Sequence, residues 1–292
     1  MIVAFVGAFC AFAVLARSPL ERVYRHFSAN SPAVPKTAYT TLRRPSGAPS
    51  MQLVVRPFVL HSSLVERSLR EVLIVPKGDG KGRPLLVLLH GRGSSPGQFL
   101  SRQWLDGLAA LGAKAPDVLL VNGGDHSYYH DRADGRWGSY LIQEAIPAGL
   151  ARSGADPGRI AIGGISMGGA GALDLAVHYP GRFCAAGGHS AALWLRSGDT
   201  ASGAYDDAAD FEHNDVIGLA RKQKKPFGTT LIWLDNSNSD PFLSADSELA
   251  AVLQRAGRQV SVHVWPGAHS SSYWNHHAGQ YLRFYADALA DC

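Results

Sequence analysis

One serine of this chain lies in a run of small residues that is typical of a catalytic nucleophile. Ser166 belongs to the segment GGISMGGAG, residues 163–171, and the residues from Gly164 to Gly168 fit the pattern G-x-S-x-G. In this pattern the serine occupies a sharp turn between a strand and a helix, where its hydroxyl can attack a carbonyl carbon. The same run also fits a tight loop or a helix-packing surface, so the interpretation depends on partners elsewhere in the chain.

The partners that a serine nucleophile needs are a base and an acid that orients the base. His269 directly follows the apolar run QVSVHVWPG at 259–267, and we expect it to be the base. The acid should follow the preceding apolar run, TTLIWLD at 229–235. We favour Asp240 for this role over Asp235, which we expect to shape the loop.

Other acidic and histidine side chains lie at less suitable places in the chain. They are Asp246 and Glu248 in the next predicted helix, His263 inside a predicted strand, and His276 and His277 at the start of the last predicted helix. His90 precedes Ser166, whereas the order in α/β-hydrolases is serine, acid, histidine, so we expect His90 to support a loop. The order Ser166, Asp240, His269 therefore predicts one catalytic triad.

Two backbone N–H groups are predicted to stabilise an oxyanion beside the serine. Met167 would begin the helix that follows Ser166, so its N–H would point back toward the serine with the favourable end of the helix dipole. Arg92 follows an H-G pair at the end of the apolar run 83–91, and its N–H is the second expected donor. Gly91 would allow the substrate to approach closely.

Apolar runs alternate with helical patterns along most of the chain. The first two runs, 51–60 and 69–76, are predicted to be paired antiparallel strands. Further strands are predicted at 83–91, 116–124, 159–164, 182–190, 229–235 and 259–267, and helices at 99–113, 139–152, 166–180, 216–223, 243–257 and 274–290. This alternation predicts an α/β fold with a mostly parallel central sheet and helices on both faces. Ligands of such sheets lie beyond the carboxyl ends of the strands, where all three triad candidates are expected.

The composition is that of a folded globular protein, and the charge argues against a nucleic-acid partner. The 292 residues are 46% apolar and 18% charged, and the formal net charge is +4. The basic residues are scattered, whereas a nucleic-acid binder concentrates them on one face. The one basic run, 221–225, is expected to be a solvated helix end.

The cysteines and histidines suggest neither a disulfide framework nor a metal site, and no cofactor is expected. The three cysteines show no C-x-x-C spacing, and Cys184, in an apolar run, is expected to be a buried apolar residue. His126 and His130 lie in the segment DHSYYHD, where no third metal ligand is visible. We expect a polar loop there.

The first 50 residues differ in character from the rest of the chain. Residues 1–16 carry no charged side chain, and we expect a signal peptide or a membrane anchor. Residues 17–50 contain a stretch rich in Pro, Ser, Thr and Ala and are expected to be a linker or N-terminal arm before a catalytic domain at 51–292. A secreted or cell-envelope protein is the favoured expectation. Because three arginines follow the apolar run, an anchor that leaves the domain in the cytoplasm is the alternative.

Several segments together resemble the putative-esterase family of α/β-hydrolases, over residues from about 52 to 290. Besides the serine motif they are LLHGRG at 88–93, WGSY at 137–140, DPGRI at 156–160, DPF at 240–242, GAH at 267–269 and YW at 273–274. That family includes S-formylglutathione hydrolase, enterochelin esterases, feruloyl esterases and mycobacterial mycolyltransferases. The resemblance implies a Ser166-Asp240-His269 triad without metal or cofactor, and oxyanion donors at Met167 and Arg92.

The expected activity is hydrolysis of carboxylic esters through an acyl-enzyme, on a small-molecule, lipid or cell-envelope substrate. A cell-envelope acyltransferase with the same triad is one alternative, because the triad does not determine whether water or an alcohol accepts the acyl group. A non-catalytic, membrane-associated binding protein is another alternative. The residues expected to line the substrate pocket, with ordinary packing as the competing interpretation, are Gly91, Tyr128, Tyr129, Trp137 and Trp194. The segment 190–214 is expected to cover one side of that pocket.

Overall fold

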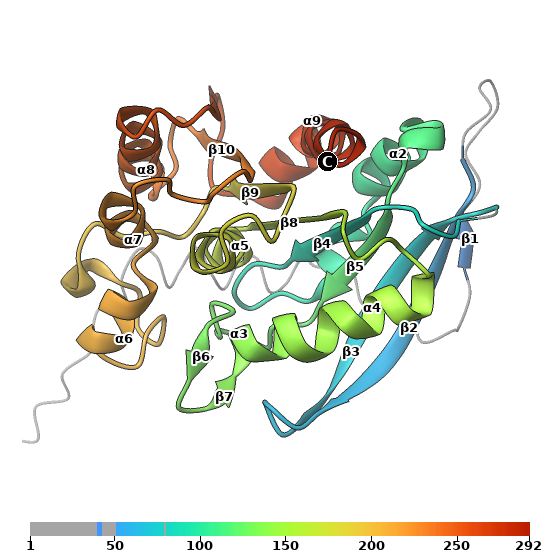
Figure 1. The fold of residues 1–292 in the computed structure, drawn as a ribbon, viewed down its shortest axis with the longest axis horizontal. Coiled ribbons are helices and arrows are strands. Elements are labelled where there is room, and N and C mark those ends of the chain that lie inside the picture. The colour runs from blue at the N-terminus through green and yellow to red at the C-terminus, as the bar shows by residue number, and fades with distance from the viewer. Residues whose placement is uncertain (1–39, 43–50, 79) are drawn as a thin grey trace, which may run out of the picture.

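A nine-stranded sheet forms the centre of the molecule in the computed structural model, which describes residues 40–42, 51–78 and 80–292 (Figure 1). The predicted signal peptide or anchor at 1–16 and most of the predicted arm at 17–50 lie outside these residues. The strands are β1 (Thr40–Leu42), β2 (Leu53–Ser62), β3 (Arg67–Pro76), β4 (Leu85–Leu89), β5 (Asp117–Val121), β8 (Ile160–Ile165), β9 (Ala185–His189), β10 (Leu231–Ser237) and β11 (Val260–Trp265). They follow the order β1-β2-β3-β5-β4-β8-β9-β10-β11 across the sheet.

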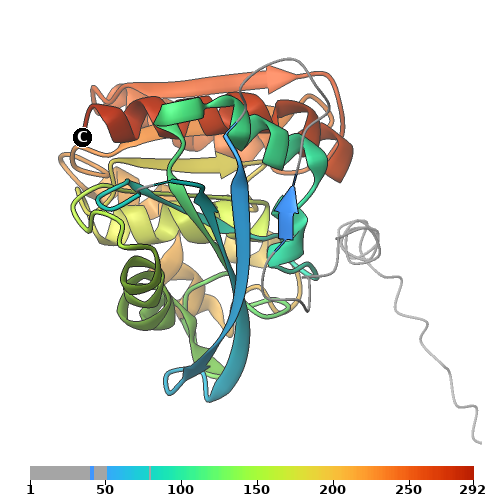
Figure 2. The same cartoon turned by 90° about the vertical axis from the view of Figure 1, so that its right-hand side faces the viewer.

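The sheet is antiparallel at its first edge and parallel in the rest. Strands β1, β2, β3 and β5 pair antiparallel in turn, and every pair from β5 and β4 through to β11 is parallel. The paired β2 and β3 extend as a long ribbon (Figure 2). Within the predicted arm, β1 pairs with β2, so three of the arm's residues belong to the sheet. The predicted mostly parallel α/β fold is confirmed.

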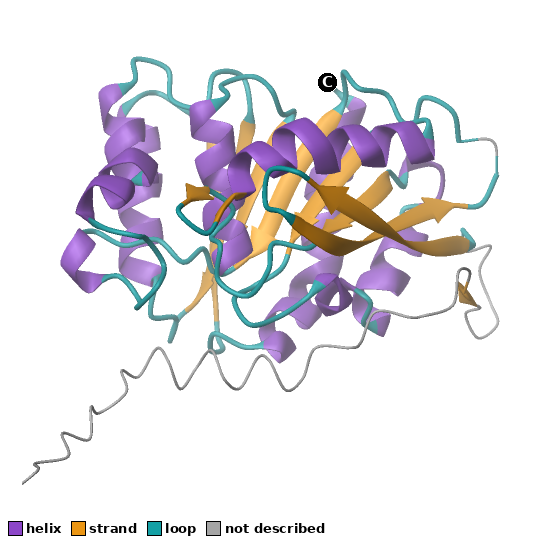
Figure 3. Ribbon diagram, turned by 90° about the horizontal axis from the view of Figure 1, so that it is seen from below, coloured by secondary structure: helices purple, strands orange, loops and turns teal. Residues whose placement is uncertain are grey.

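Both faces of the central parallel strands are buried, because helices lie on both sides of the sheet (Figure 3). In β4, Leu85, Val87 and Leu89 join one hydrophobic cluster, whereas Leu86 and Leu88 join the other. Alternate side chains of a strand point to opposite faces, so a strand covered on both sides has an unbroken apolar sequence. The continuous run at 83–91 is therefore explained by its central position.

The helices that cover the two faces are mostly those that the sequence predicts. They are α2 (Arg102–Ala110), α3 (Trp137–Tyr140), α4 (Ile146–Ser153), α5 (Met167–His178), α6 (Ala208–Asn214), α7 (Val216–Lys222), α8 (Leu243–Arg255) and α9 (Ser271–Ala290). Side chains of α2 and α9 belong to one cluster, and those of α4, α5, α7 and α8 belong to the other. The segment Leu141–Ala145 between α3 and α4 is a π-helical turn, and the short hairpin of β6 (Asp131–Arg132) and β7 (Gly135–Arg136) precedes α3.

A disulfide joins Cys184 and Cys292, contrary to the expectation that Cys184 is only a buried apolar residue. Cys184 does lie buried, directly before β9, and Cys292 follows α9. The two residues are 108 positions apart, and their Cα atoms are 5.8 Å apart. The bond ties the end of α9 to the amino-end edge of the parallel strands. Cys10, the third cysteine, lies outside the described residues.

Strand β11 forms the second edge of the sheet. Among the described residues its only pairing partner is β10. Its sequence, VSVHVW, carries neither a charged residue nor a proline, and Val262 and Val264 are 42% and 50% exposed. This edge therefore presents apolar side chains to solvent.

Candidate active site

The predicted nucleophile occupies a strained turn between β8 and α5. Ser166 has a φ of 55°, a backbone conformation that few residues other than glycine adopt. Its N–H donates to the carbonyl of His189 at 2.9 Å, and its own carbonyl accepts the N–H of Ala192 at 3.0 Å. The turn is therefore held by β9 and by the segment that follows β9. Such strain is typical of functional positions.

The glycines of the motif are required by the close approach of backbone at this turn. A Cβ atom at Gly164 would lie 2.6 Å from the carbonyl oxygen of Leu89 and would overlap the backbone of Gly168. A Cβ atom at Gly168 would overlap the carbonyl of Leu89. Because Leu89 is the last residue of β4, these glycines let α5 begin directly beside the neighbouring strand.

The three predicted triad side chains form one hydrogen-bonded chain. Nε2 of His269 lies 3.0 Å from the hydroxyl oxygen of Ser166, and Nδ1 of His269 lies 3.0 Å from Oδ2 of Asp240. Since an ionised carboxylate can only accept hydrogen bonds, Nδ1 carries a proton, and Nε2 is left to accept the serine hydroxyl. All three residues are buried. The three residues come from loops or turns after β8, β10 and β11, so the sheet brings together positions up to 103 residues apart.

The carboxylate of Asp240 is stabilised in its ionised form. Burial alone would raise the pKa of Asp240 and favour the protonated acid. The pKa nevertheless lies below its usual value, because hydrogen bonds to the carboxylate and its electrostatic attraction to His269 outweigh burial. The donor besides His269 is the backbone N–H of Phe242, at 3.0 Å from Oδ1. The acid is therefore charged and able to hold the imidazole tautomer that Ser166 requires.

The predicted oxyanion donors flank Ser166, and their roles stay predictions. Met167 is the first residue of α5, so its N–H has no acceptor within the helix. On the other side, the backbone after β4 lies alongside the nucleophile, since a Cβ atom added at Gly91 would be only 3.6 Å from Cβ of Ser166. The N–H of Gly91 itself donates to Oε1 of Gln98 at 2.8 Å, so the next residue, Arg92, remains the candidate donor on this side.

His90 supports the loop, as expected. Burial lowers the pKa of His90 to about 4, so its ring is neutral at neutral pH. Nδ1 lies 2.9 Å from the carbonyl oxygen of Gly91, and Nε2 accepts the N–H of Gly123 at 3.1 Å. The ring therefore joins the loops that follow β4 and β5 and fixes the backbone on which Arg92 lies.

Asp235 lies inside β10, so the expectation that it shapes the loop is wrong. Its carboxylate is fully buried and accepts four hydrogen bonds. The donors are Nδ1 of His189 at 2.7 Å, Nε1 of Trp233 at 2.8 Å, and the hydroxyls of Tyr273 at 3.1 Å and Tyr281 at 2.8 Å. Nε2 of His189 in turn lies 2.9 Å from the hydroxyl oxygen of Tyr285. This network joins β9, β10 and α9 beneath the triad.

Two glycines in neighbouring strands are a sign of this network in the sequence. A Cβ atom at Gly163 in β8 or at Gly187 in β9 would overlap the hydroxyl of Tyr285. Glycine inside a strand often marks a place where another group approaches closely. Gly163 and Gly187 thus mark the space into which the Tyr285 hydroxyl fits.

The aromatic residues predicted to line the pocket fall into two groups. Trp194 packs against Phe242 with ring centroids 5.5 Å apart, and Phe242 packs against His269 at 5.3 Å. The ring centroids of Tyr128 and Trp194 are 5.6 Å apart, so Tyr128 belongs to the same group of rings that reaches His269. All four predicted side chains are buried in one hydrophobic cluster, and Tyr129 and Trp137 pack there on other partners. Tyr129 fills the space beside Gly171 of α5, and Trp137 packs on Tyr140 and over Gly124.

The histidines of the segment DHSYYHD have acidic partners. His126 is half-buried and lies 3.4 Å from Asp125, and the buried His130 lies 3.1 Å from Asp210 of α6. Within the described part of the chain, no group of three or more His, Cys, Asp or Glu side chains is placed to hold a metal ion. In the same residues no helix is both long and apolar enough to span a bilayer.

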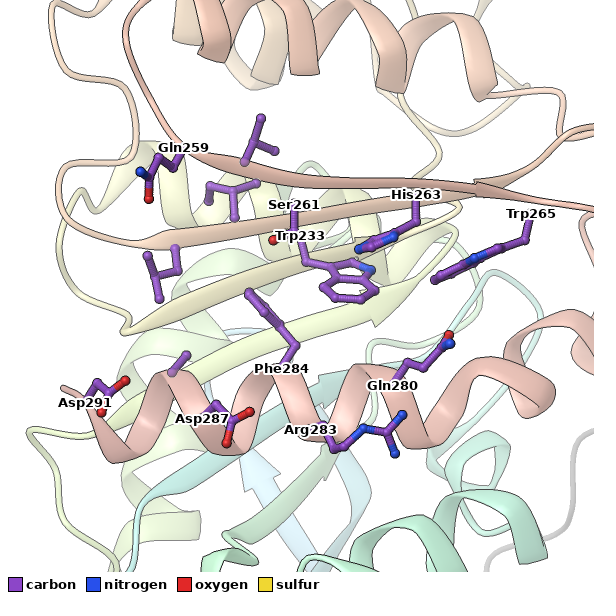
Figure 4. A pocket seen from close by; sticks show the side chains of 14 residues that line it. Trp233, Gln259, Ser261, His263, Trp265, Gln280, Arg283, Phe284, Asp287 and Asp291 are labelled. Carbon is purple, nitrogen blue, oxygen red and sulfur yellow. The ribbon is translucent and has the colours of Figure 1, made fainter.

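A separate groove of about 740 Å³ lies between β11 and α9 (Figure 4). Its strand side carries Trp233, His263 and Trp265, and its helix side carries Arg283 and Phe284, among others. None of the triad residues lines this groove. His263, as expected, is a face residue of its strand.

Comparison with known proteins identifies the family of this chain. The model of the family described as Putative esterase matches residues 62–284. Esterase Rv1288 of Mycobacterium tuberculosis is 28% identical over 226 residues, which cover 65% of this chain and 49% of the relative. The chain thus spans about half the length of the curated relatives that it matches.

Solved structures share the fold at low sequence identity. A ferulic acid esterase superimposes with a TM-score of 0.73 at 20% identity, covering 82% of this chain and 99% of the other. An S-formylglutathione hydrolase from Agrobacterium tumefaciens superimposes with a TM-score of 0.70 at 15% identity, covering 87% and 100%. The fold is therefore that of the α/β-hydrolases, and the family match over 62–284 shows that this chain belongs to the Putative esterase family.

Proposed function

We propose that the protein is a serine hydrolase that cleaves carboxylic esters through an acyl-enzyme intermediate. The observation that carries this proposal is the hydrogen-bonded chain from Ser166 through His269 to Asp240, with both distances at 3.0 Å. The family membership supports an ester as the substrate class. The identities of the acyl and alcohol groups stay open.

In the first half of the reaction Ser166 replaces the alcohol of the ester. As Oγ of Ser166 attacks the carbonyl carbon, Nε2 of His269 takes the hydroxyl proton, and Asp240 stabilises the imidazolium that forms. The negative oxygen of the tetrahedral intermediate accepts hydrogen bonds from the N–H groups of Met167 and Arg92. The C–O bond to the alcohol then breaks, and His269 gives the proton to the departing oxygen.

In the second half water replaces the serine. His269 takes a proton from the water as its oxygen attacks the acyl carbon, and the same two N–H groups hold the second oxyanion. The bond to Oγ of Ser166 breaks, the proton returns to the serine, and the carboxylic acid leaves. An alcohol in place of water would make the reaction an acyl transfer with the same residues.

The direct test is a panel of esters with short to long acyl chains, assayed with the wild type and with Ser166→Ala. We expect the wild type to hydrolyse part of the panel and Ser166→Ala to lose at least about 1,000-fold in kcat, because the nucleophile is gone. Met167→Leu should keep nearly all the activity, because Met167 acts through its backbone. A fluorophosphonate probe should label the wild type and leave Ser166→Ala unlabelled.

Two results would contradict the proposal. One is a folded wild type that neither hydrolyses the panel nor reacts with the probe, which would favour a binding protein. The other is equal labelling of the wild type and Ser166→Ala, which would place the reactive serine elsewhere. Product analysis with added glycerol or sugar separates hydrolysis from acyl transfer.

We infer further that the protein acts outside the cytoplasm. The disulfide between Cys184 and Cys292 supports this, because such bonds persist mainly in oxidising compartments. The apolar residues 1–16 support it as well. Fractionation of producing cells, with the activity found only in the cytoplasmic fraction, would contradict it.

A further inference from the structure

Glu71 is a fully buried acidic side chain that has no part in the steps of the proposed reaction. It lies in β3 and joins this strand to two elements further along the chain. Oε2 accepts the backbone N–H of Asn122, directly after β5, at 2.7 Å, and Oε1 lies 2.7 Å from the hydroxyl oxygen of Tyr140 in α3. A buried polar group is stable only where its hydrogen bonds are made. Glu71 therefore fixes the backbone at which the loop after β5 begins.

The loop after β5, residues 122–125, reaches the candidate oxyanion site through His90. The N–H of Gly123, next to the residue that Glu71 holds, donates to Nε2 of His90 at 3.1 Å. Because burial keeps the His90 ring neutral and Nε2 is an acceptor, the ring proton lies on Nδ1. Nδ1 lies 2.9 Å from the carbonyl oxygen of Gly91 and donates to it. A series of hydrogen-bonded groups thus leads from β3 to Gly91.

The carbonyl of Gly91 and the N–H of Arg92 belong to the same peptide group. A trans peptide group is planar, with its C=O and N–H on opposite sides, so the bond to the carbonyl of Gly91 determines where the N–H of Arg92 points. On the other side of Arg92, the N–H of Gly93 donates to the carbonyl oxygen of Asp125, in the same loop, at 2.8 Å. The loop therefore holds both neighbours of the second candidate oxyanion donor.

From this arrangement we propose that Glu71 is a positioning residue for the oxyanion donor at Arg92. It acts from a distance, through residues 122–125 and through His90. The inference rests on the proposed ester hydrolysis, in which the N–H of Arg92 stabilises the tetrahedral intermediate. Because the oxyanion forms as the carbonyl is attacked and is absent from the bound ester, loss of Glu71 should lower kcat and leave ester binding almost unchanged.

The test compares Glu71→Leu with Glu71→Gln. Leucine removes both oxygens, and we expect kcat to fall about 10-fold or more while KM changes less than about 2-fold. Burial raises the pKa of Glu71 to about 8, so the side chain is mostly uncharged at neutral pH, as an amide is. The amide oxygen of glutamine still accepts the N–H of Asn122, so Glu71→Gln should keep kcat within about 3-fold of the wild type.

An inhibitor that forms an oxyanion separates positioning from a general loss of order. The carbonyl carbon of a trifluoromethyl ketone bonds to Oγ of Ser166, the serine proton passes to His269, and the ketone oxygen becomes an oxyanion beside the same donors. Glu71→Leu should weaken the binding of this inhibitor by about the factor by which kcat/KM falls. Glu71→Gln should bind it as the wild type does.

His90→Phe tests the same arrangement if Glu71→Leu does not fold. Phenylalanine keeps a ring beside Tyr129 and removes both ring nitrogens, so the carbonyl of Gly91 loses the donor that orients it. We expect kcat to fall about 10-fold or more in this variant as well, with the same weakening of the inhibitor.

A matched control is Asp117→Leu. Asp117 is also a fully buried acid, and it begins β5, at the end of the strand opposite to Asn122. This variant should keep the wild-type kcat and inhibitor affinity. The positioning role is wrong, while the esterase stands, if folded Glu71→Leu and His90→Phe keep both, or if Glu71→Gln is as slow as Glu71→Leu. An inactive wild type would instead contradict the proposed function itself.

Discussion

At the scale of single residues, the chain contains two buried aspartates near the site, and they have different surroundings. Asp240 faces His269 and one further donor, the backbone N–H of Phe242, at the end of the triad. Asp235 faces His189 and three aromatic side chains inside the fold. The order of residues and the strand ends were enough to predict Ser166, His269 and the choice of Asp240. His189 was not predicted, because a lone histidine at the end of a strand has no motif and its role depends on packing.

The two aspartates should respond differently to the same substitution. Asp240→Asn should lower kcat about 1,000- to 10,000-fold with little change in melting temperature, because the amide favours the wrong imidazole tautomer. Asp235→Asn should instead lower the free energy of unfolding by about 3 kcal/mol, because the amide nitrogen cannot accept the hydrogen bonds donated to the oxygen that it replaces. Kinetics and denaturant unfolding on both variants measure this. Equal kinetic losses without a difference in stability would show that Asp235 also serves the chemistry.

At the scale of the elements, the turn between β8 and α5 determines how close the helix lies to the sheet. The alternation of apolar runs and helical patterns predicted the main strands and helices, with boundaries shifted by a few residues. The last helix begins at Ser271 and not at the predicted 274, since the hydroxyl of Ser270 caps it by accepting the N–H of Tyr273. The hairpin of β6 and β7 was missed because two-residue strands have no period, and α6 was missed because its sequence is mostly polar.

A glycine substitution tests this turn directly. Gly168→Ala would place a methyl group into the carbonyl of Leu89, a backbone group that cannot turn aside as a flexible side chain can. We expect it to lower the free energy of unfolding by about 3 kcal/mol and to remove most of the activity, because α5 must shift away from β4. Gly198→Ala is the control, since no atom lies within 4 Å of the added Cβ. Wild-type stability and activity in Gly168→Ala would contradict the close packing described for the turn.

At the scale of the whole molecule, the sheet order and the disulfide depend on contacts between distant parts of the chain. The sequence predicted a mostly parallel sheet but not the order β3-β5-β4-β8, which no local pattern encodes. It also gave no sign of the bond between Cys184 and Cys292, because two cysteines 108 residues apart have no recognisable spacing. Only the folded chain brings the end of α9 to the start of β9.

The disulfide should contribute to stability and not to chemistry. Closing a loop of this length removes chain entropy from the unfolded state, which corresponds to about 4–5 kcal/mol. Reduction by dithiothreitol, or Cys292→Ser, should therefore lower the melting temperature by several degrees or more. Ester hydrolysis at a temperature where the reduced protein stays folded should be unchanged. The disulfide lies at the amino ends of the parallel strands, whereas Ser166 lies at their carboxyl ends. A melting temperature that is insensitive to reduction would contradict this account.

The exposed edge strand β11 has a consequence for handling the purified protein. An uncharged strand with free N–H and C=O groups along one side is a template on which another extended chain can add. Partly unfolded molecules in a concentrated solution would add there first, since VSVHVW has high β-propensity and no charged residue to prevent stacking. Storage at low concentration, or a lysine in place of the half-exposed Val264, is therefore the simplest protection against precipitation.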